Sequence, residues 1–204
     1  MSTPPFPSLR QSLLVLTLCL PAADLVLAQS GTHPSTGTSA RPQDGIGKKR
    51  EGLQAMERRF IEQAAMSGMA EVELGKLAQQ KAANAAVKQY GQAMASEHTN
   101  ANLQLKQLAT SKGVVVPDQP SPKQQNDMKM LQTLSGPEFD RQYMAHMVSD
   151  HEKTIADFDR LSRDGQDLEL KAYAASTLPT LRKHLQHAQQ VRDAVSAERQ
   201  SSAK

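Results

Sequence analysis

The chain has 204 residues, which is enough for one medium-sized domain with its own hydrophobic core. Its formal net charge is +3, acidic and basic residues are interspersed, tryptophan is absent, and aromatic residues make up 3% of the chain. These features disfavour a basic nucleic-acid-binding surface and aromatic platforms for stacking bases. The many alanine, glutamine and methionine residues, with few β-branched ones, predict an all-α fold.

Residues 1–28 have the layout of a secretory signal peptide. Arg10 precedes the apolar run "LLVLTLCL", and Ala28 supplies a small residue at the expected cleavage point. The run is too short to span a bilayer and no other stretch qualifies. We therefore expect an exported, periplasmic protein with no transmembrane segment in the mature chain. The single cysteine, Cys19, lies within the predicted signal, so the mature chain would have no disulfide or thiolate site.

A linker and two long helices are expected next. Residues 29–50 are rich in Gly, Ser, Thr and Pro without apolar periodicity, which predicts a disordered linker. Helical spacing of apolar residues starts at about residue 51 and defines a first helix. Asn84 can cap a second helix, which Gly113 and Pro117 would end.

The second half of the chain predicts three further helices. Ser121 and Pro122 are suited to be the cap and first residue of a short helix. A third long helix is expected to start near Ser135–Gly136. A fourth is expected over roughly 167–197, and it contains Pro179, at which it either kinks or gives way to a new helix.

Four long amphipathic helices with one long middle connection predict a four-helix bundle over residues 51–197. The middle connection, which holds the short extra helix, is what a ferritin-like topology requires. Residues 198–204 are predicted to be a disordered tail.

Each long helix carries one metal-ligating side chain on the face predicted to be buried, when residues are placed at ~100° per residue. An unpaired buried carboxylate is very costly, so such groups are expected to satisfy one another, directly or through a metal. Three imidazoles and a carboxylate suit one ion of zinc, iron, manganese or copper. The predicted ligands are Glu71, His98, His151 and His184.

Two nine-residue segments share one pattern. "YGQAMASEH" at 90–98 and "YMAHMVSDH" at 143–151 both follow Tyr-x-x-x-Met-x-Ser-acid-His. The acidic residue before each histidine can support a ligand on a neighbouring helix. The methionines are more simply explained as core residues, and the alternative is thioether ligation of copper(I). The candidates for supporting the site are Tyr90, Met94, Glu97, Tyr143, Met147 and Asp150.

A structural interpretation competes with the metal site. A histidine on an apolar helix face is more often a core imidazole bonded to a neighbouring helix, and Glu71 can be a half-exposed residue paired with a basic side chain. Together the four groups can also form a metal-free network that sets the register of the helices. The remaining histidines, His33, His146 and His187, are assigned to the surface.

Several segments resemble a bacterial envelope family named domain of unknown function 4142. The resemblance covers about residues 55–195 and includes "GPEFDRQYMAHMVSDHEKTIADF" and "LPTLRKHLQHAQQV". It implies a ferritin-like fold and a group of proteins often labelled as outer-membrane proteins, with no activity established for the class. The family's recurring residues correspond here to Glu71 or Glu73, to Glu97-His98, to Asp150-His151 and to His184.

The predicted function is that of an exported binding protein that holds one transition metal for buffering, sensing or envelope stress tolerance. The first alternative is a metal-free structural or interaction protein of the envelope, and the second is a mononuclear metalloenzyme. Ferritin-like di-iron sites use Glu-x-x-His pairs, which do not occur around these histidines, so di-iron chemistry is not expected. An enzyme ranks last because four protein ligands leave no open position on a tetrahedral metal.

Overall fold

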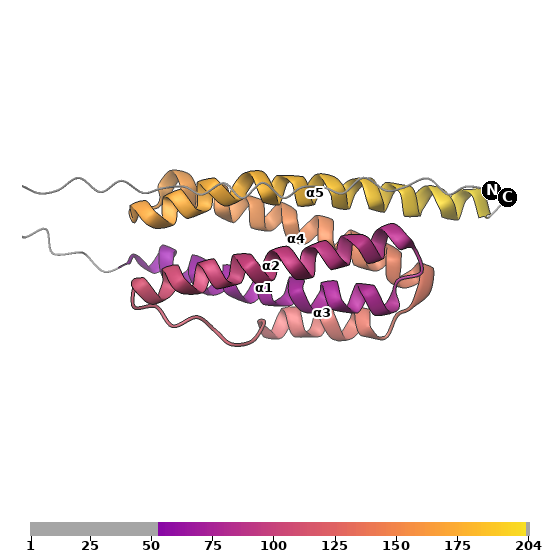
Figure 1. Cartoon of the computed structure of the whole chain (residues 1–204), viewed down its shortest axis with the longest axis horizontal. Helices are drawn as coiled ribbons and strands as arrows, with labels where there is room; N and C mark the ends of the chain where they lie inside the picture. The colour runs from indigo at the N-terminus through magenta and orange to yellow at the C-terminus, as the bar shows by residue number, and fades with distance from the viewer. Residues whose placement is uncertain (1–52, 203–204) are drawn as a thin grey trace, which may run out of the picture. The chain divides into compact units, whose positions relative to one another are not determined.

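Five α-helices and no strand make up the part of the chain that the structure, a computed structural model, describes, which is residues 53–202 (Figure 1). The all-α prediction is therefore confirmed for these residues. The predicted signal peptide and linker, with Cys19 and His33, lie outside them. The helices are α1 (Ala55–Lys81), α2 (Ala85–Ser111), α3 (Pro122–Gln132), α4 (Gly136–Asp164) and α5 (Leu168–Ser202).

The helix starts follow local capping chemistry. The Asn84 side chain accepts a hydrogen bond from the backbone N–H of Ala86, as an N-cap should. Ser121 and Gln124 form a reciprocal capping box at the start of α3, and Pro122 occupies its first position. These two predicted starts agree with the structure.

Two details of α5 differ from or refine the prediction. The helix runs through Pro179 without a second helix starting there. It also continues to Ser202, so the tail predicted at 198–204 is wrong as far as that residue. The segment "AERQSS" contains no helix breaker, and alanine, glutamate, arginine and glutamine all favour helix, so nothing in it ends α5.

The long helices form two antiparallel hairpins, α1–α2 and α4–α5, which also contact each other through α1–α4 and α2–α5 (Figure 1). The connection from α2 to α4 contains α3, which packs on α1 and α4. Because this connection returns along the length of the hairpins, α2 and α4 run in the same direction. Equivalent positions of the two helices can therefore lie at the same height.

The core consists of two apolar clusters. One contains residues such as Leu74, Tyr90 and Met147, and the other contains residues such as Ile61, Leu105 and Leu181. On each of the four long helices, the cluster changes from one to the other across a single buried polar residue. These four residues are Glu71, His98, His151 and His184. A polar layer therefore separates two apolar halves.

Two other buried carboxylates connect the two hairpins, one near each end of the helices. Glu57 of α1 accepts hydrogen bonds at 2.8 and 2.7 Å from the backbone N–H groups of Gln166 and Asp167, in the turn between α4 and α5. Asp140 of α4 accepts bonds at 3.1 and 2.9 Å from the N–H groups of residues 83 and 84, in the turn between α1 and α2. Each hairpin thus satisfies backbone donors in the other's turn, which sets their relative height.

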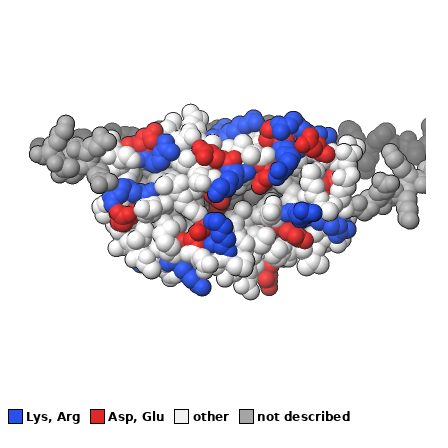
Figure 2. Space-filling view, turned by 180° about the vertical axis from the view of Figure 1, so that it is seen from behind, with Lys and Arg blue, Asp and Glu red and all other residues white. Residues whose placement is uncertain are grey.

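The surface carries mixed charge. On the face shown in Figure 2, lysine and arginine side chains lie beside aspartate and glutamate side chains, and neither sign gathers into a separate patch. Among residues 53–202, no helix combines the length and the apolar character that crossing a membrane requires.

The close approach of α1 and α2 generates a prediction. A Cβ on Gly75 would lie 2.4 Å from the carbonyl oxygen of Gly91, whereas one on Gly68 would meet mainly the side-chain end of Asn102. Backbone cannot yield as a side chain can, so Gly75→Ala is expected to lower the free energy of unfolding by about 1–3 kcal/mol through overpacking. Gly68→Ala, the matched control, should range from neutral to a gain of about 1 kcal/mol from helix propensity.

Urea unfolding monitored by circular dichroism measures both variants. If Gly75→Ala and Gly68→Ala lower the free energy of unfolding equally, α1 and α2 are not held in contact at Gly75.

Candidate metal site

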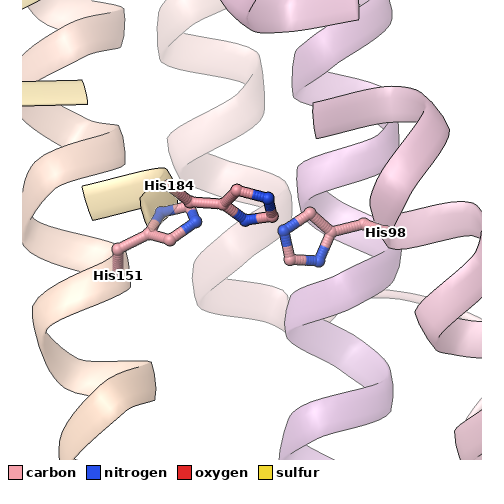
Figure 3. Close-up of side chains that lie close together, drawn as sticks. All are labelled: His98, His151 and His184. Atoms are coloured by element: carbon pink, nitrogen blue, oxygen red, sulfur yellow. The ribbon is translucent and has the colours of Figure 1, made fainter. Parts of the chain in front are cut away.

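The polar layer brings together one side chain from each long helix. Nε2 of His98 lies 2.6 Å from Oε2 of Glu71, and Nε2 of His151 lies 3.6 Å from the same oxygen. The ligand nitrogens of His98, His151 and His184 all lie within 4.8 Å of one another, and the rings point toward one another from α2, α4 and α5 (Figure 3). The exposed fraction of these four residues is 7% or less.

Glu71 supplies a negative charge to this layer. Burial by itself raises the pKa of Glu71, but the imidazoles of His98 and His151 beside it outweigh burial and hold the pKa well below its usual range. Burial lowers the pKa of His98, and the negative charge of Glu71 outweighs that effect and raises it. Glu71 is therefore ionised at neutral pH, and His98 is its nearest counter-charge.

Two of the imidazoles have their inward nitrogen left without a hydrogen-bond partner. Nδ1 of His151 lies 3.0 Å from the backbone carbonyl of Met147, to which it donates. Nε2 of His184 donates over 2.8 Å to the Glu97 carboxylate, and burial holds the pKa of His184 below its ordinary value despite this partner. Nε2 of His151 and Nδ1 of His184 are therefore the nitrogens left for the interior of the layer, and both are buried without a hydrogen-bond partner.

The donor set fits a transition metal. Oε2 of Glu71 and Nε2 of His98 are close enough for an ion pair, yet neither has the alignment of a hydrogen bond. Unprotonated nitrogens of His151 and His184 would repel the nearby Glu71 carboxylate unless a proton or a cation lay between them. A tetrahedral metal with bonds of about 2.0–2.1 Å to nitrogen separates its ligands by about 3.4 Å, so small side-chain shifts suffice for coordination.

The predicted supporting residues take different positions. Glu97, next to His98 in sequence, binds His184 of α5, so the acid supports a histidine on another helix. Asp150, next to His151, lies near Glu71; burial and the Glu71 charge raise the pKa of Asp150 to about 7. Glu97 holds the ring orientation of His184, as carboxylates around metal-bound histidines do.

The tyrosines and methionines of the repeated pattern lie at other heights in the core. Tyr90 and Tyr143 contact edge to face at 6.2 Å, as His98 and His151 do at 5.9 Å. On each helix the tyrosine precedes the histidine by eight residues, so the two pairs lie ~12 Å apart along the parallel helices α2 and α4. Met94 and Met147 lie buried in the apolar cluster that contains the tyrosines. The repeat therefore sets matched levels on α2 and α4.

The other candidate residues lie away from the four-residue layer. His187 is exposed and packs its ring on Tyr90 at 5.2 Å, and His146 is half-buried in a surface pocket. Glu73, the alternative to Glu71, is exposed and pairs with Lys76 at 2.7 Å. The buried caps Glu57 and Asp140 were not predicted, because their partners lie in turns far away in sequence.

The fold and this layer define an all-α protein with a buried histidine–carboxylate centre. A profile of the family described as "Domain of unknown function (DUF4142)" matches residues 47–191. The chain belongs to this family, which confirms the resemblance found in its sequence. No curated protein matches the chain.

A solved structure with a similar fold is the crystal structure of a DUF305 fragment from Deinococcus radiodurans. It is 15% identical in sequence and superimposes with a TM-score of 0.61 over 70% of this chain and 99% of that one. At this identity the likeness concerns the arrangement of helices alone.

The ion pair of Glu71 and His98 predicts a pH-dependent stability in chelator-treated protein. Removing one partner of a buried pair costs about 3–5 kcal/mol, and Glu71→Gln is expected to approach that loss near pH 6. His98, with a raised pKa, stabilises fully below its ordinary value of 6.5 and loses this effect as pH rises through its folded pKa. Glu71, with a lowered pKa, stabilises above 4.5 and loses this effect in acid.

The difference between wild type and variant should therefore be largest between about pH 4.5 and 6.5 and shrink toward pH 9, as urea unfolding across this range can measure. Glu73→Gln, two residues along the same helix, is the control and should change stability by less than about 1 kcal/mol. A difference that is flat with pH would contradict the ion pair.

Proposed function

We propose that this protein is a ferritin-like four-helix bundle that binds one transition-metal ion through Glu71, His98, His151 and His184. The four long helices, the long middle connection and the fold shared with the DUF305 fragment support the bundle. The polar layer between two apolar clusters supports a site at its centre.

The observation that carries the proposal is the pair of inward, unpartnered imidazole nitrogens. His151 and His184 each have the outer nitrogen held by a carbonyl or a carboxylate, which leaves the inner nitrogen without a partner and available to a metal. Metal-binding histidines are held in this manner, because the outer hydrogen bond sets the tautomer and the ring orientation.

The donor set determines the class of ion. Three imidazoles and one carboxylate suit zinc, iron, manganese or copper in divalent form and are poor ligands for calcium or magnesium. The single carboxylate does not supply the bridging set of a di-iron centre. We infer that the site binds a single ion and that the protein buffers or senses metal after export. The predicted signal peptide at residues 1–28 would direct this export.

A second candidate is a metal-free structural role. The 2.6 Å approach of His98 to Glu71 favours it, because a protonated His98 pairs with the carboxylate without any metal. In that case the four residues act only to set the register of the helices.

Metal binding separates the two candidates. Mature protein purified without affinity tag or chelator is expected to contain close to one metal ion per chain by mass spectrometry. His184→Gln should weaken the affinity measured by titration calorimetry by more than the roughly 10–100-fold that loss of a supporting residue costs. His187→Gln, one turn along α5 and exposed, is the matched control and should bind as wild type.

If the wild-type protein is purified without metal and also fails to bind added zinc, copper, iron or manganese, the metal-binding proposal is wrong and the structural role remains.

Glu97 provides a test of the supporting contact. Glu97→Gln keeps the shape of the side chain but removes the charge that holds His184. We expect one metal to bind with about 10–100-fold lower affinity, because the ligand loses its orienting partner. Glu73→Gln removes a charge of the same type from an exposed position and should leave the affinity unchanged. Equal affinities for both variants would mean that Glu97 does not support the site.

A further inference from the structure

A small cavity lies directly beside two of the proposed ligands. It has a volume of about 30 Å³ and is lined by Glu71 and His98 together with residues of all four long helices. Small side chains on α1 and α2, including Gly68 and Ala101, create the space. A water molecule needs about 10–15 Å³ and two to four polar partners, so the cavity has room for one or two waters.

The cavity wall supplies those polar partners. Besides Glu71 and His98, the hydroxyls of Ser67 and Thr154 and the amide of Asn102 line it. The rest of the wall includes Tyr173 and Thr177 and apolar residues such as Leu105 and Phe158. A small neutral molecule such as water fits beside the Glu71 carboxylate better than a second anion does.

A polar pocket on the outside leads toward the same place. It has a volume of about 500 Å³ and is lined by residues of α1, α3 and α4, among them Asp127, His146 and Asp150. Ser67 and Thr154 line both this pocket and the inner cavity, so these two side chains separate them. Ser67 also accepts a 3.0 Å hydrogen bond from the Gln124 amide of α3. Solvent in the outer pocket is therefore separated from the inner cavity by these two small polar side chains.

We propose that the inner cavity holds an exchangeable water that coordinates the metal as an additional ligand, reached from the outer pocket past Ser67 and Thr154. The inference rests on the proposed metal site and deepens it. Four protein ligands fill every position of a tetrahedral ion. The cavity beside Glu71 and His98 leaves room for a fifth ligand, so the ion can become five-coordinate. The site then differs from a closed structural metal centre.

Water-proton relaxation of copper(II)-loaded protein tests this directly. Copper(II) is paramagnetic. A water that binds it and exchanges with solvent therefore raises the relaxation rate of the bulk water protons, and this rate is much lower when no water binds the copper. Wild type is expected to show this inner-sphere enhancement. Ala101→Val extends a side chain into the cavity and should lose the enhancement while still binding one copper. Ala145→Val, the same change at an exposed position of α4, should keep it.

The outcomes separate the two proposals. Stoichiometric copper binding by wild type with no inner-sphere enhancement would overturn the exchangeable water and leave the metal site standing. Failure of wild type to bind copper or any of the other three metals would overturn the metal site itself. If Ala101→Val binds copper and retains the full enhancement, the water does not occupy this cavity.

Discussion

The buried charge of Glu71 is the constraint on which the rest of the structure depends. An ionised carboxylate with 1% exposure is stable only where positive charge or hydrogen-bond donors surround it. Here His98 and His151 face one of its oxygens, at 2.6 and 3.6 Å. His184 completes the layer, and its own outer nitrogen is held by Glu97. The helices must keep one relative height for these contacts to exist together, so a slip of one turn of α1 or α2 would separate Glu71 from His98.

That height is maintained at several levels. The two apolar clusters meet at the polar layer, so moving a helix by one turn, ~5.4 Å, would bring a charged or imidazole group into an apolar half. At the ends, Glu57 and Asp140 each bond backbone donors of the opposite hairpin. Between α2 and α4, the shared eight-residue spacing places tyrosine beside tyrosine and histidine beside histidine. Local capping, apolar packing and the polar layer therefore all specify the same arrangement.

The helices and the polar layer could be predicted from the sequence because both follow from periodicity. Asn84 and Ser121 act through neighbours two or three residues away, and Glu71 and the three histidines interrupt apolar faces at helical spacing. Contacts between distant segments could not be predicted. One example is the hydrogen bond that His184 donates to Glu97, and others are the caps formed by Glu57 and Asp140. All of them depend on which helices become neighbours. The inner cavity was also beyond prediction, because it results from small residues on separate helices.

X-ray absorption at the edge of the bound metal identifies the atoms that surround the ion. In zinc-loaded protein, we expect nitrogen and oxygen ligands at about 2.0–2.1 Å and the outer-shell scattering of three imidazoles. The outer-shell signal should fall by about one imidazole in His151→Gln. An oxygen-only shell without imidazole scattering, or a spectrum that His151→Gln does not change, would show that the buried layer does not bind the metal.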